Sequence, residues 1–287
     1  MNQISPELAK KLTLAVEKMP AFPKSVQKIL ELTRNLDCEP KQLVQVIEKD
    51  PVMTVKILRV LNSAYYNLPS KITSVNHSVV FLGFNTIKNL ALSIASVGIL
   101  PKYNAAGFDI QHYLLHSLTT AGIAKSLAGK LGGADPMDCY IAGLLHDFGK
   151  VVFAQFMPDE FNQAMQKSRS ENISLHVAES QVIGVDHTVV GSMLAEKWQF
   201  PQTLIDCIRN HHSADSGEGG MWASVYAANQ ISKKLSFGDS GNPCIETLPP
   251  AVCNYFGGDI DEIIASLRDL PKIVEEAQLF SQVGADA

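Results

Sequence analysis

Apolar residues recur along this chain at the spacing of an α-helix, and no run shows the strict alternation typical of a β-strand. The pattern is clearest after Asp50-Pro51, which resembles an N-cap followed by proline at the first helical position. From Met53 to Ala64 the apolar residues fall on one helical face, which predicts a helix packed inward. The stretch from Thr86 to Leu100 is apolar on nearly all sides, as a central buried helix would be.

Longer helices are predicted in the middle of the chain. The segments from Ile110 to Leu131 and from Met137 to Phe156 are typical of long helices, and the second ends before Pro158. Asp186 and Pro201 mark the starts of two more helices. Taken together, these segments predict an all-α fold.

Three polar or glycine-containing segments, at 104–107, 213–220 and 237–243, interrupt the helical pattern. We predict an N-terminal helical lobe over residues 1–105, packed on a central multi-helix lobe over residues 106–236. A C-terminal helical extension over residues 237–287 is expected to follow.

The composition narrows the range of functions. With 287 residues, of which 46% are apolar and 18% charged, the chain can bury a substantial core. A net charge of −5 and the lack of a basic run argue against DNA or RNA as a partner. Five widely spaced cysteines without a C-x-x-C pair fit a reducing cytoplasm. Because we find neither a signal peptide nor an apolar run long enough to span a bilayer, we expect a soluble cytoplasmic protein without a membrane partner.

Six residues with metal-binding side chains follow one another along the central lobe: His116, His146, Asp147, His187, His211 and His212. Neutral imidazole and carboxylate groups suit iron, zinc or manganese, so this set could hold one or two transition-metal ions. His112 shares a helical face with His116 and is a further candidate ligand. Adjacent residues of a helix point to different sides, so an apolar stripe gains nothing from having both His146 and Asp147.

Lys150 is a candidate for a catalytic role. It lies one helical turn after His146 and could contact a phosphate oxygen, although a solvated charge near a helix end is an equally simple interpretation. Two metal ions bridged by water would let such a site hold a phosphodiester for in-line attack. By contrast, His77, His176 and Cys139 are interpreted as ordinary polar or core residues outside the site.

Several motifs resemble those of a known family. Residues 144–150, Leu-Leu-His-Asp-Phe-Gly-Lys, match the motif of the HD superfamily of metal-dependent phosphohydrolases. Other segments resemble the HDOD family, the HD-related output domains of bacterial signalling proteins, over about residues 15–235. The segments that carry this resemblance are Met19–Pro23, Ile47–Pro51, Leu58–Tyr66, Val80–Phe84, Gly143–Asp147 and Trp198–Pro201.

The resemblance implies a function as well as a fold. The HDOD family is all-α and generally regulatory, and its members commonly lack part of the HD ligand set, which leaves them catalytically silent. By this resemblance the chain is a stand-alone, non-catalytic signal-transduction protein with an HD-like central lobe, acting through contacts with a signalling protein partner. We expect the partner surface around Asn62 to Leu68, where Tyr65 and Tyr66 leave the apolar stripe of their helix.

The same residues leave an enzymatic alternative open. The six candidate ligands and Lys150 match positions of the HD-GYP cyclic-di-GMP phosphodiesterases, in which Lys150 would be a catalytic residue. However, Asn229 stands where the last aspartate ligand would be, and residues 213–217 lack the Gly-Tyr-Pro signature. The amide of Asn229 would be a weaker, uncharged ligand. The alternatives are therefore a metal-dependent phosphohydrolase acting on a nucleotide or cyclic dinucleotide, and a sensor that binds a metal or a nucleotide without turnover.

Overall fold

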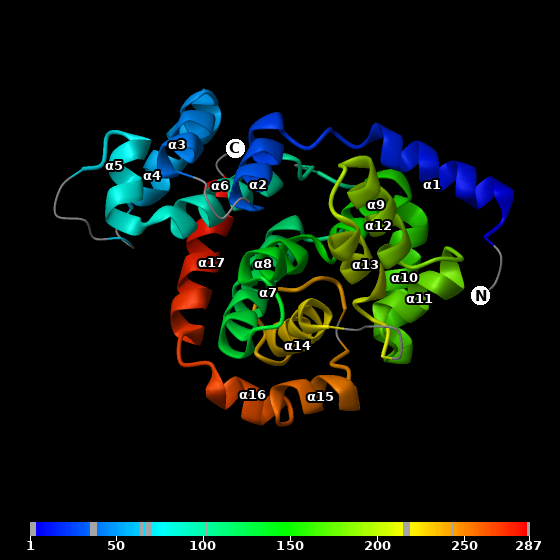
Figure 1. The fold of residues 1–287 in the computed structure, drawn as a ribbon. Coiled ribbons are helices and arrows are strands. Elements are labelled where there is room, and N and C mark those ends of the chain that lie inside the picture. Colours follow the sequence, from blue (N-terminus) through cyan, green and yellow to red (C-terminus); the bar gives the residue numbers. More distant parts are fainter. Residues whose placement is uncertain are drawn as a thin grey trace. The chain divides into compact units, whose positions relative to one another are not determined.

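The computed structural model describes residues 4–34, 39–63, 66, 71–101, 103–214, 219–242 and 244–285. Every regular element in these residues is an α-helix, which confirms the predicted all-α fold (Figure 1). The helices form two compact units. No helix within the described ranges is both long and apolar enough to cross a lipid bilayer.

The larger unit contains residues 1–20 and 101–277. Its helices are α1 (Pro6–Lys18), α7 (Ile110–Leu131), α8 (Pro136–Leu145), α9 (Phe148–Phe156), α10 (Pro158–Glu171), α11 (Leu175–Val182), α12 (His187–Lys197), α13 (Gln202–Asn210), α14 (Gly220–Lys234), α15 (Pro250–Phe256), α16 (Ile260–Ser266) and the first part of α17 (Leu270–Ala285). The bounds of α7 are those that the apolar pattern predicts, and Asp186 and Pro201 are the N-caps of α12 and α13.

This unit differs from the predicted central lobe at both of its ends. α1 belongs to it, because the ammonium group of Lys197 holds the end of that helix. This group donates hydrogen bonds to the carbonyl oxygens of Val16, Glu17 and Met19, at 2.9, 2.9 and 2.7 Å. Residues 237–277 also belong to this unit and do not form a separate extension.

The smaller unit contains residues 21–100 and 278–287. Its helices are α2 (Lys24–Arg34), α3 (Pro40–Glu48), α4 (Pro51–Leu61), α5 (Val75–Leu82) and α6 (Phe84–Gly98), together with the last part of α17. Asp50 is the N-cap of α4, as predicted, since its carboxylate accepts a hydrogen bond from the backbone N–H of Met53 at 3.1 Å. Most of the expected partner surface at 62–68 lies outside the described residues.

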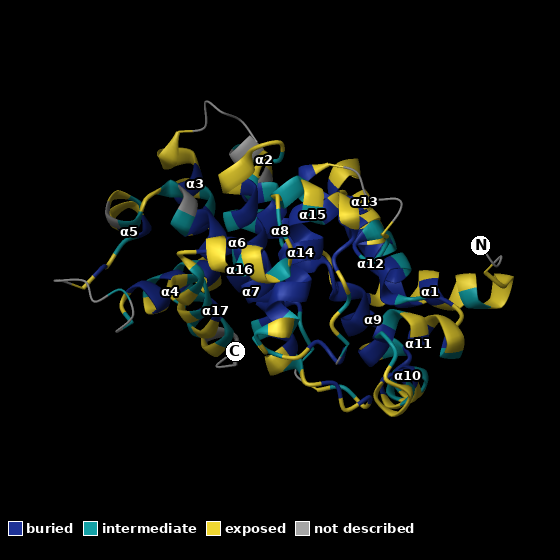
Figure 2. Cartoon of the chain, turned by 90° about the horizontal axis from the view of Figure 1, so that it is seen from below, coloured by how far each residue is buried: buried dark blue, intermediate teal, exposed yellow. Residues whose placement is uncertain are grey.

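The core of the larger unit lies where α7, α8 and α14 pack against one another. Figure 2 shows these helices as largely buried. α7 and α8 approach closely at Gly143, where a Cβ atom would lie only 2.8 Å from the Cα of Ala121. The absence of a side chain at Gly143 therefore allows the end of α8 to pack directly on α7.

The helix predicted from Met137 to Phe156 is two helices, α8 and α9, because the chain turns at His146 and Asp147. The backbone of Asp147 leaves the helical region, with φ −94° and ψ 6°. Successive side chains of a continuous helix point about 100° apart, so an unbroken helix would direct these two to different sides. The prediction of a single helix was therefore wrong. The turn between α8 and α9 lets the side chains of both His146 and Asp147 face one buried space.

Candidate metal centre

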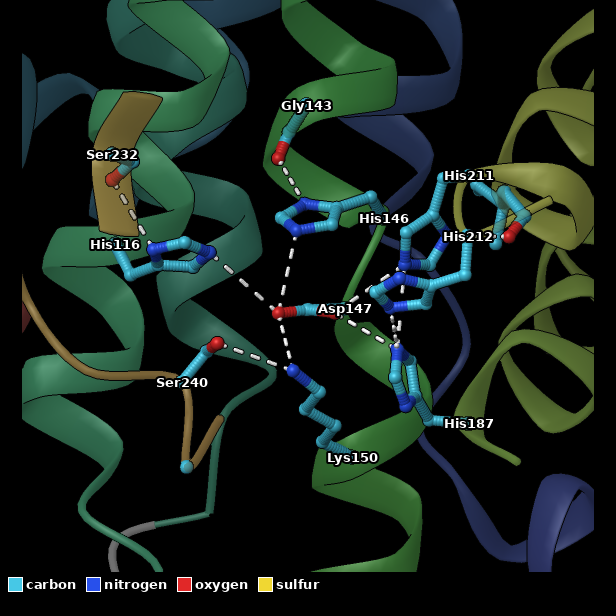
Figure 3. A network of polar contacts seen from close by, with 12 residues as sticks. His116, Gly143, His146, Asp147, Lys150, His187, His211, His212, Ser232 and Ser240 are labelled. Carbon is cyan, nitrogen blue, oxygen red and sulfur yellow. Dashed lines mark hydrogen bonds and ion pairs between the residues drawn. The ribbon is translucent and has the colours of Figure 1, made fainter. Parts of the chain in front are cut away.

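The six predicted metal ligands converge around Asp147 in the larger unit (Figure 3). They come from four places in the fold: His116 from the middle of α7, His146 and Asp147 from the turn between α8 and α9, His187 from the start of α12, and His211 with His212 from the end of α13. Residues that are up to 96 positions apart in the sequence therefore share one centre.

The carboxylate of Asp147 faces an Nε2 atom on each of four rings. Its Oδ2 lies 3.3 Å from His146 Nε2 and 3.7 Å from His116 Nε2. Its Oδ1 lies 3.0 Å from His187 Nε2 and 3.5 Å from His211 Nε2. Asp147 therefore belongs to two groups of potential ligands, one with His116 and His146, and another with the histidines of α12 and the end of α13.

The other ring nitrogen, Nδ1, is held by an acceptor outside the centre. His146 Nδ1 donates to the carbonyl oxygen of Gly143 at 2.8 Å, and His211 Nδ1 donates to that of Ile208 at 2.7 Å. A carbonyl oxygen can only accept, so each ring carries a proton on Nδ1 and turns its Nε2 atom inward. Proteins orient metal-binding histidines by outer hydrogen bonds of this kind.

The other three rings have outer contacts of the same type. His187 Nδ1 donates to the carboxylate of Glu179 in α11 at 2.6 Å. His116 Nδ1 lies 3.2 Å from the hydroxyl of Ser232 in α14, and His212 Nδ1 lies 3.4 Å from Glu246 Oε2. All five rings are thus oriented from outside, with Nε2 toward the centre.

The inward-facing nitrogen atoms lie close to one another. His187 Nε2 is 3.3 Å from His211 Nε2 and 3.2 Å from His212 Nε2. His116 Nε2 and His146 Nε2 have no hydrogen-bond partner within the described part of the chain. Buried polar atoms without partners are costly, and facing lone pairs repel each other. A bound cation would relieve both problems, and nitrogen with carboxylate oxygen is a donor set suited to a transition metal.

When no metal is bound, a proton on His187 supplies part of the positive charge that a metal ion would bring to the centre. Burial alone would lower the pKa of His187, but the charge of Glu179 and the hydrogen bonds to Asp147 and Glu179 raise it to about 9. Burial lowers the pKa of His211 to about 3. Burial would raise the pKa of Asp147, but the charges of His146 and Lys150 hold it well below its usual value. The metal-free centre therefore contains an ionised Asp147 beside a protonated His187.

Lys150 is a buried residue of the centre, which excludes the interpretation as a solvated charge. Its ammonium group lies 2.7 Å from Asp147 Oδ2 and donates to the hydroxyl of Ser240 at 3.2 Å. Ser240 lies in the segment that follows α14. Lys150 therefore joins the turn between α8 and α9 to that segment.

Gly149 fixes the distance between the two halves of the centre. A Cβ atom there would lie 1.9 Å from the carbonyl oxygen of His187 and 2.9 Å from the backbone nitrogen of Gly191. Because no side chain fits at this position, α9 can pack on the first turn of α12. That contact brings Asp147 within reach of His187.

Two further candidates have different positions. His112 lies outside the centre, since its exposed ring contacts the N-cap residue of α7, Asp109, at 2.7 Å. Asn229 is buried on α14, one turn before Ser232, and neither atom of its amide group has a hydrogen-bond partner among the described residues. Asn229 thus lies on the α14 face that contacts His116 through Ser232.

Some residues of the centre were not predicted from the sequence. His176, interpreted as an ordinary residue, stacks on His212 with ring centroids 4.2 Å apart, and its Nδ1 lies 3.3 Å from Glu246 Oε1. Glu179 and Glu246 were not identified either. Their contacts depend on how α11 and the segment after α14 fold back onto the histidines, and no spacing in the sequence indicates this. Cys139 is fully buried, as predicted for a core residue.

An all-helical unit with histidines and one aspartate around a buried centre defines a protein of the HD type. The family model of the HDOD domain matches residues 19–214, and the chain belongs to this family. A crystal structure of an HDOD domain protein of unknown function from Geobacter sulfurreducens shares the fold, with a TM-score of 0.77 and 24% identity. The match covers 95% of this chain and 99% of that chain.

Two curated relatives are similar in sequence. A match to an uncharacterized protein of Treponema pallidum is 23% identical over 252 residues, which are 87% of this chain and 48% of that protein. Ribonuclease Y of Mycoplasma mycoides subsp. mycoides is 27% identical over 153 residues, which are 52% of this chain and 25% of that protein. The chain thus spans about half or less of the length of these relatives.

Proposed function

We propose that this HDOD protein is a regulatory signalling protein whose HD-like centre binds one or two transition-metal ions, and that it hydrolyses no substrate. The observation that carries the proposal is the arrangement of the five histidines. Each directs Nε2 toward the centre while Nδ1 contacts an outer group, and Asp147 supplies the carboxylate. Iron, manganese or zinc would supply a positive charge there that links four parts of the fold.

Two features support a non-catalytic role. His146, Asp147, Lys150, His187 and His211 each have 0% of their surface exposed, so a phosphodiester has no open path to them in this conformation. In addition, Asn229 brings no negative charge, so a second metal ion would be held weakly and would activate water poorly. A regulatory protein of this kind would act through contacts with a signalling partner.

Elemental analysis of protein purified without oxygen or chelator tests the metal centre. We expect at least one transition-metal ion per chain. Replacing His146 and Asp147 together by Ala should remove the metal while circular dichroism shows the helices retained. His112→Ala is the matched control and should keep the metal, because that ring is exposed. A wild-type protein free of metal would contradict the proposal.

Turnover assays test the absence of catalysis. Wild-type protein, loaded with iron, manganese or zinc, should hydrolyse cyclic dinucleotides and simple phosphodiesters very slowly or not at all. Robust metal-dependent hydrolysis that His146→Ala abolishes would replace the regulatory function with an enzymatic one.

A phosphohydrolase acting on a nucleotide or cyclic dinucleotide is the second candidate function. One specific observation favours it: the ammonium group of Lys150 lies 2.7 Å from the carboxylate of Asp147, close to where a metal-bound phosphate would be. The similarity to ribonuclease Y over 52% of this chain points in the same direction. In such an enzyme Lys150→Met would remove turnover but not metal.

Tyr66 offers a test of the partner surface. It is half-buried and lies after the end of α4, outside the apolar stripe of that helix. We expect Tyr66→Ala to weaken binding of a purified signalling partner without lowering the melting temperature. A large fall in melting temperature would instead identify Tyr66 as a core residue.

A further inference from the structure

Lys233, near the end of α14, has a buried ammonium group that no hydrogen bond or ion pair within the described residues satisfies. Its residue as a whole is half-buried, so the aliphatic part of the side chain reaches the surface while Nζ does not. The next residue, Lys234, is different: it is exposed and pairs with Asp261 at 2.7 Å. A buried charge without a partner is strongly unfavourable, so an anion bound beside this ammonium group would be stabilising.

The nearby carboxylates are already bound to other groups. Burial and the charge of Lys150 lower the pKa of Lys233 to about 8, and the charges of Glu246 and Asp147 only partly oppose them. Asp147 is bound by Lys150 at 2.7 Å. Glu246 accepts a hydrogen bond from Ser174 at 2.5 Å and lies 3.4 Å from His212 Nδ1. The charge of Lys233 therefore has no counter-ion of its own among the residues that the structure describes.

Asn229 adds a second unsatisfied donor on the same face of α14. It precedes Lys233 by four residues, which places the two side chains next to each other on a helix. Its amide nitrogen, like the ammonium group of Lys233, is buried and has no hydrogen-bond partner in the described part of the chain. An amide and an ammonium one turn apart suit an anion with several oxygen atoms, such as a phosphate group.

A surface pocket lies beside Glu246, whose charge also acts on Lys233. Glu246 lines this pocket of about 290 Å³, together with Lys234 and residues 245–248. The same side chain contacts His212 on its other side.

We propose that Lys233, assisted by Asn229, binds the phosphate group of a small ligand next to the metal centre. The inference rests on the proposed function, since the ligand would be bound there without turnover. It names the class of ligand that the centre would sense: inorganic phosphate or a phosphomonoester.

Isothermal titration of the purified 287-residue protein with inorganic phosphate, and separately with AMP, tests this site at constant ionic strength. Lys233→Met should weaken phosphate binding by about tenfold or more, because it removes a charge-assisted hydrogen bond. It should also raise the melting temperature in phosphate-free buffer, because an unpaired buried charge is removed. Lys234→Met is the matched control and should change neither quantity by a comparable amount. Tighter binding of AMP than of phosphate would identify a nucleotide as the source of the phosphate group, and the reverse would identify the free ion.

Equal phosphate affinity in the wild type and in Lys233→Met, or no binding by the wild type, would overturn the inference. Metal analysis of the same samples separates this result from the proposed function. Lys233→Met should retain the wild-type metal content, because no lysine is among the candidate ligands. Phosphate binding by a metal-free wild type would support the site while contradicting the metal-binding function.

Discussion

Glu179 binds His187 through a single oxygen atom at two points. Glu179 Oε2 accepts hydrogen bonds from the backbone N–H of His187 at 2.9 Å and from its Nδ1 at 2.6 Å. Both residues are fully buried. One carboxylate of α11 therefore contacts both the backbone at the start of α12 and the first side chain of that helix.

Replacing Glu179 by Gln should weaken metal binding by about 10- to 100-fold, the usual effect of losing an outer partner of a metal-binding histidine. An amide cannot offer His187 the same negative charge, so the ring becomes a poorer ligand. Competition with a fluorescent chelator measures the affinity. Glu196→Gln, which removes only the exposed pair with Arg209, should leave it unchanged. Equal affinities in all three proteins would rule out this role for Glu179.

The stability of the metal-free protein should depend on pH through His187. Its folded-state pKa of about 9 exceeds the ordinary value of 6.5, so protonation favours the folded state. This contribution is fully present below pH 6.5 and is lost as the pH rises through about 9. Melting temperatures measured in chelator should fall over that interval. In His187→Gln the fall should be smaller, and an unchanged profile would show that another group is responsible.

Metal affinity should rise with pH, whereas the stability of the metal-free protein should fall. Binding to His187 Nε2 displaces the proton that this ring carries at neutral pH, so the apparent affinity should rise between pH 6.5 and about 9. Metal titrations followed by proton release in weakly buffered solution measure this linkage. Binding that is independent of pH would indicate that His187 is not a ligand.

Gly149→Ala should disrupt the centre without removing a ligand. The new methyl group would lie 1.9 Å from the carbonyl oxygen of His187, so α9 and α12 must separate. We expect a loss of about 3 kcal/mol or more in the free energy of unfolding, together with loss of metal. Gly129→Ala in α7 is the control: its methyl group meets only Pro136 Cγ at 4.0 Å. That variant should gain about 0.5–1 kcal/mol, measured by urea denaturation.

Asn229→Asp should raise metal occupancy, because it adds a carboxylate in nearly the same volume at a position without hydrogen-bond partners in the described residues. Hydrolysis of cyclic dinucleotides should remain slow, since residues 213–217 lack the Gly-Tyr-Pro signature. Elemental analysis beside the exposed control Asn254→Asp on α15 measures the change. If occupancy does not change, Asn229 does not face the metal site.

The helices and the candidate ligands could be predicted from the sequence because both depend on local information. Apolar spacing and capping residues fixed the ends of α7 and the start of α4. The turn at His146 and Asp147 was missed, because neither of these residues is a glycine or proline and apolar residues flank them on both sides. Lys233 and Lys234 look alike in sequence, but the ammonium group of the first is buried, whereas the second is exposed and pairs with Asp261.

The outer contacts of Glu179, Glu246 and His176 could not be predicted for a related reason. Each joins segments that are distant in the sequence, and an acidic residue or a single histidine on a helix is usually a surface residue. Metal binding by the assembled residues remains a prediction.

The two carbonyl groups that orient His146 and His211 belong to Gly143 and Ile208, and therefore to the backbone. No exchange of side chains can remove these acceptors as long as α8 and α13 keep their last turns. A lineage of such proteins can thus change most of its surface, and even stop using a metal, while these two rings keep their direction. Metal binding could then be regained by restoring a few ligand side chains at the centre, without a change of fold.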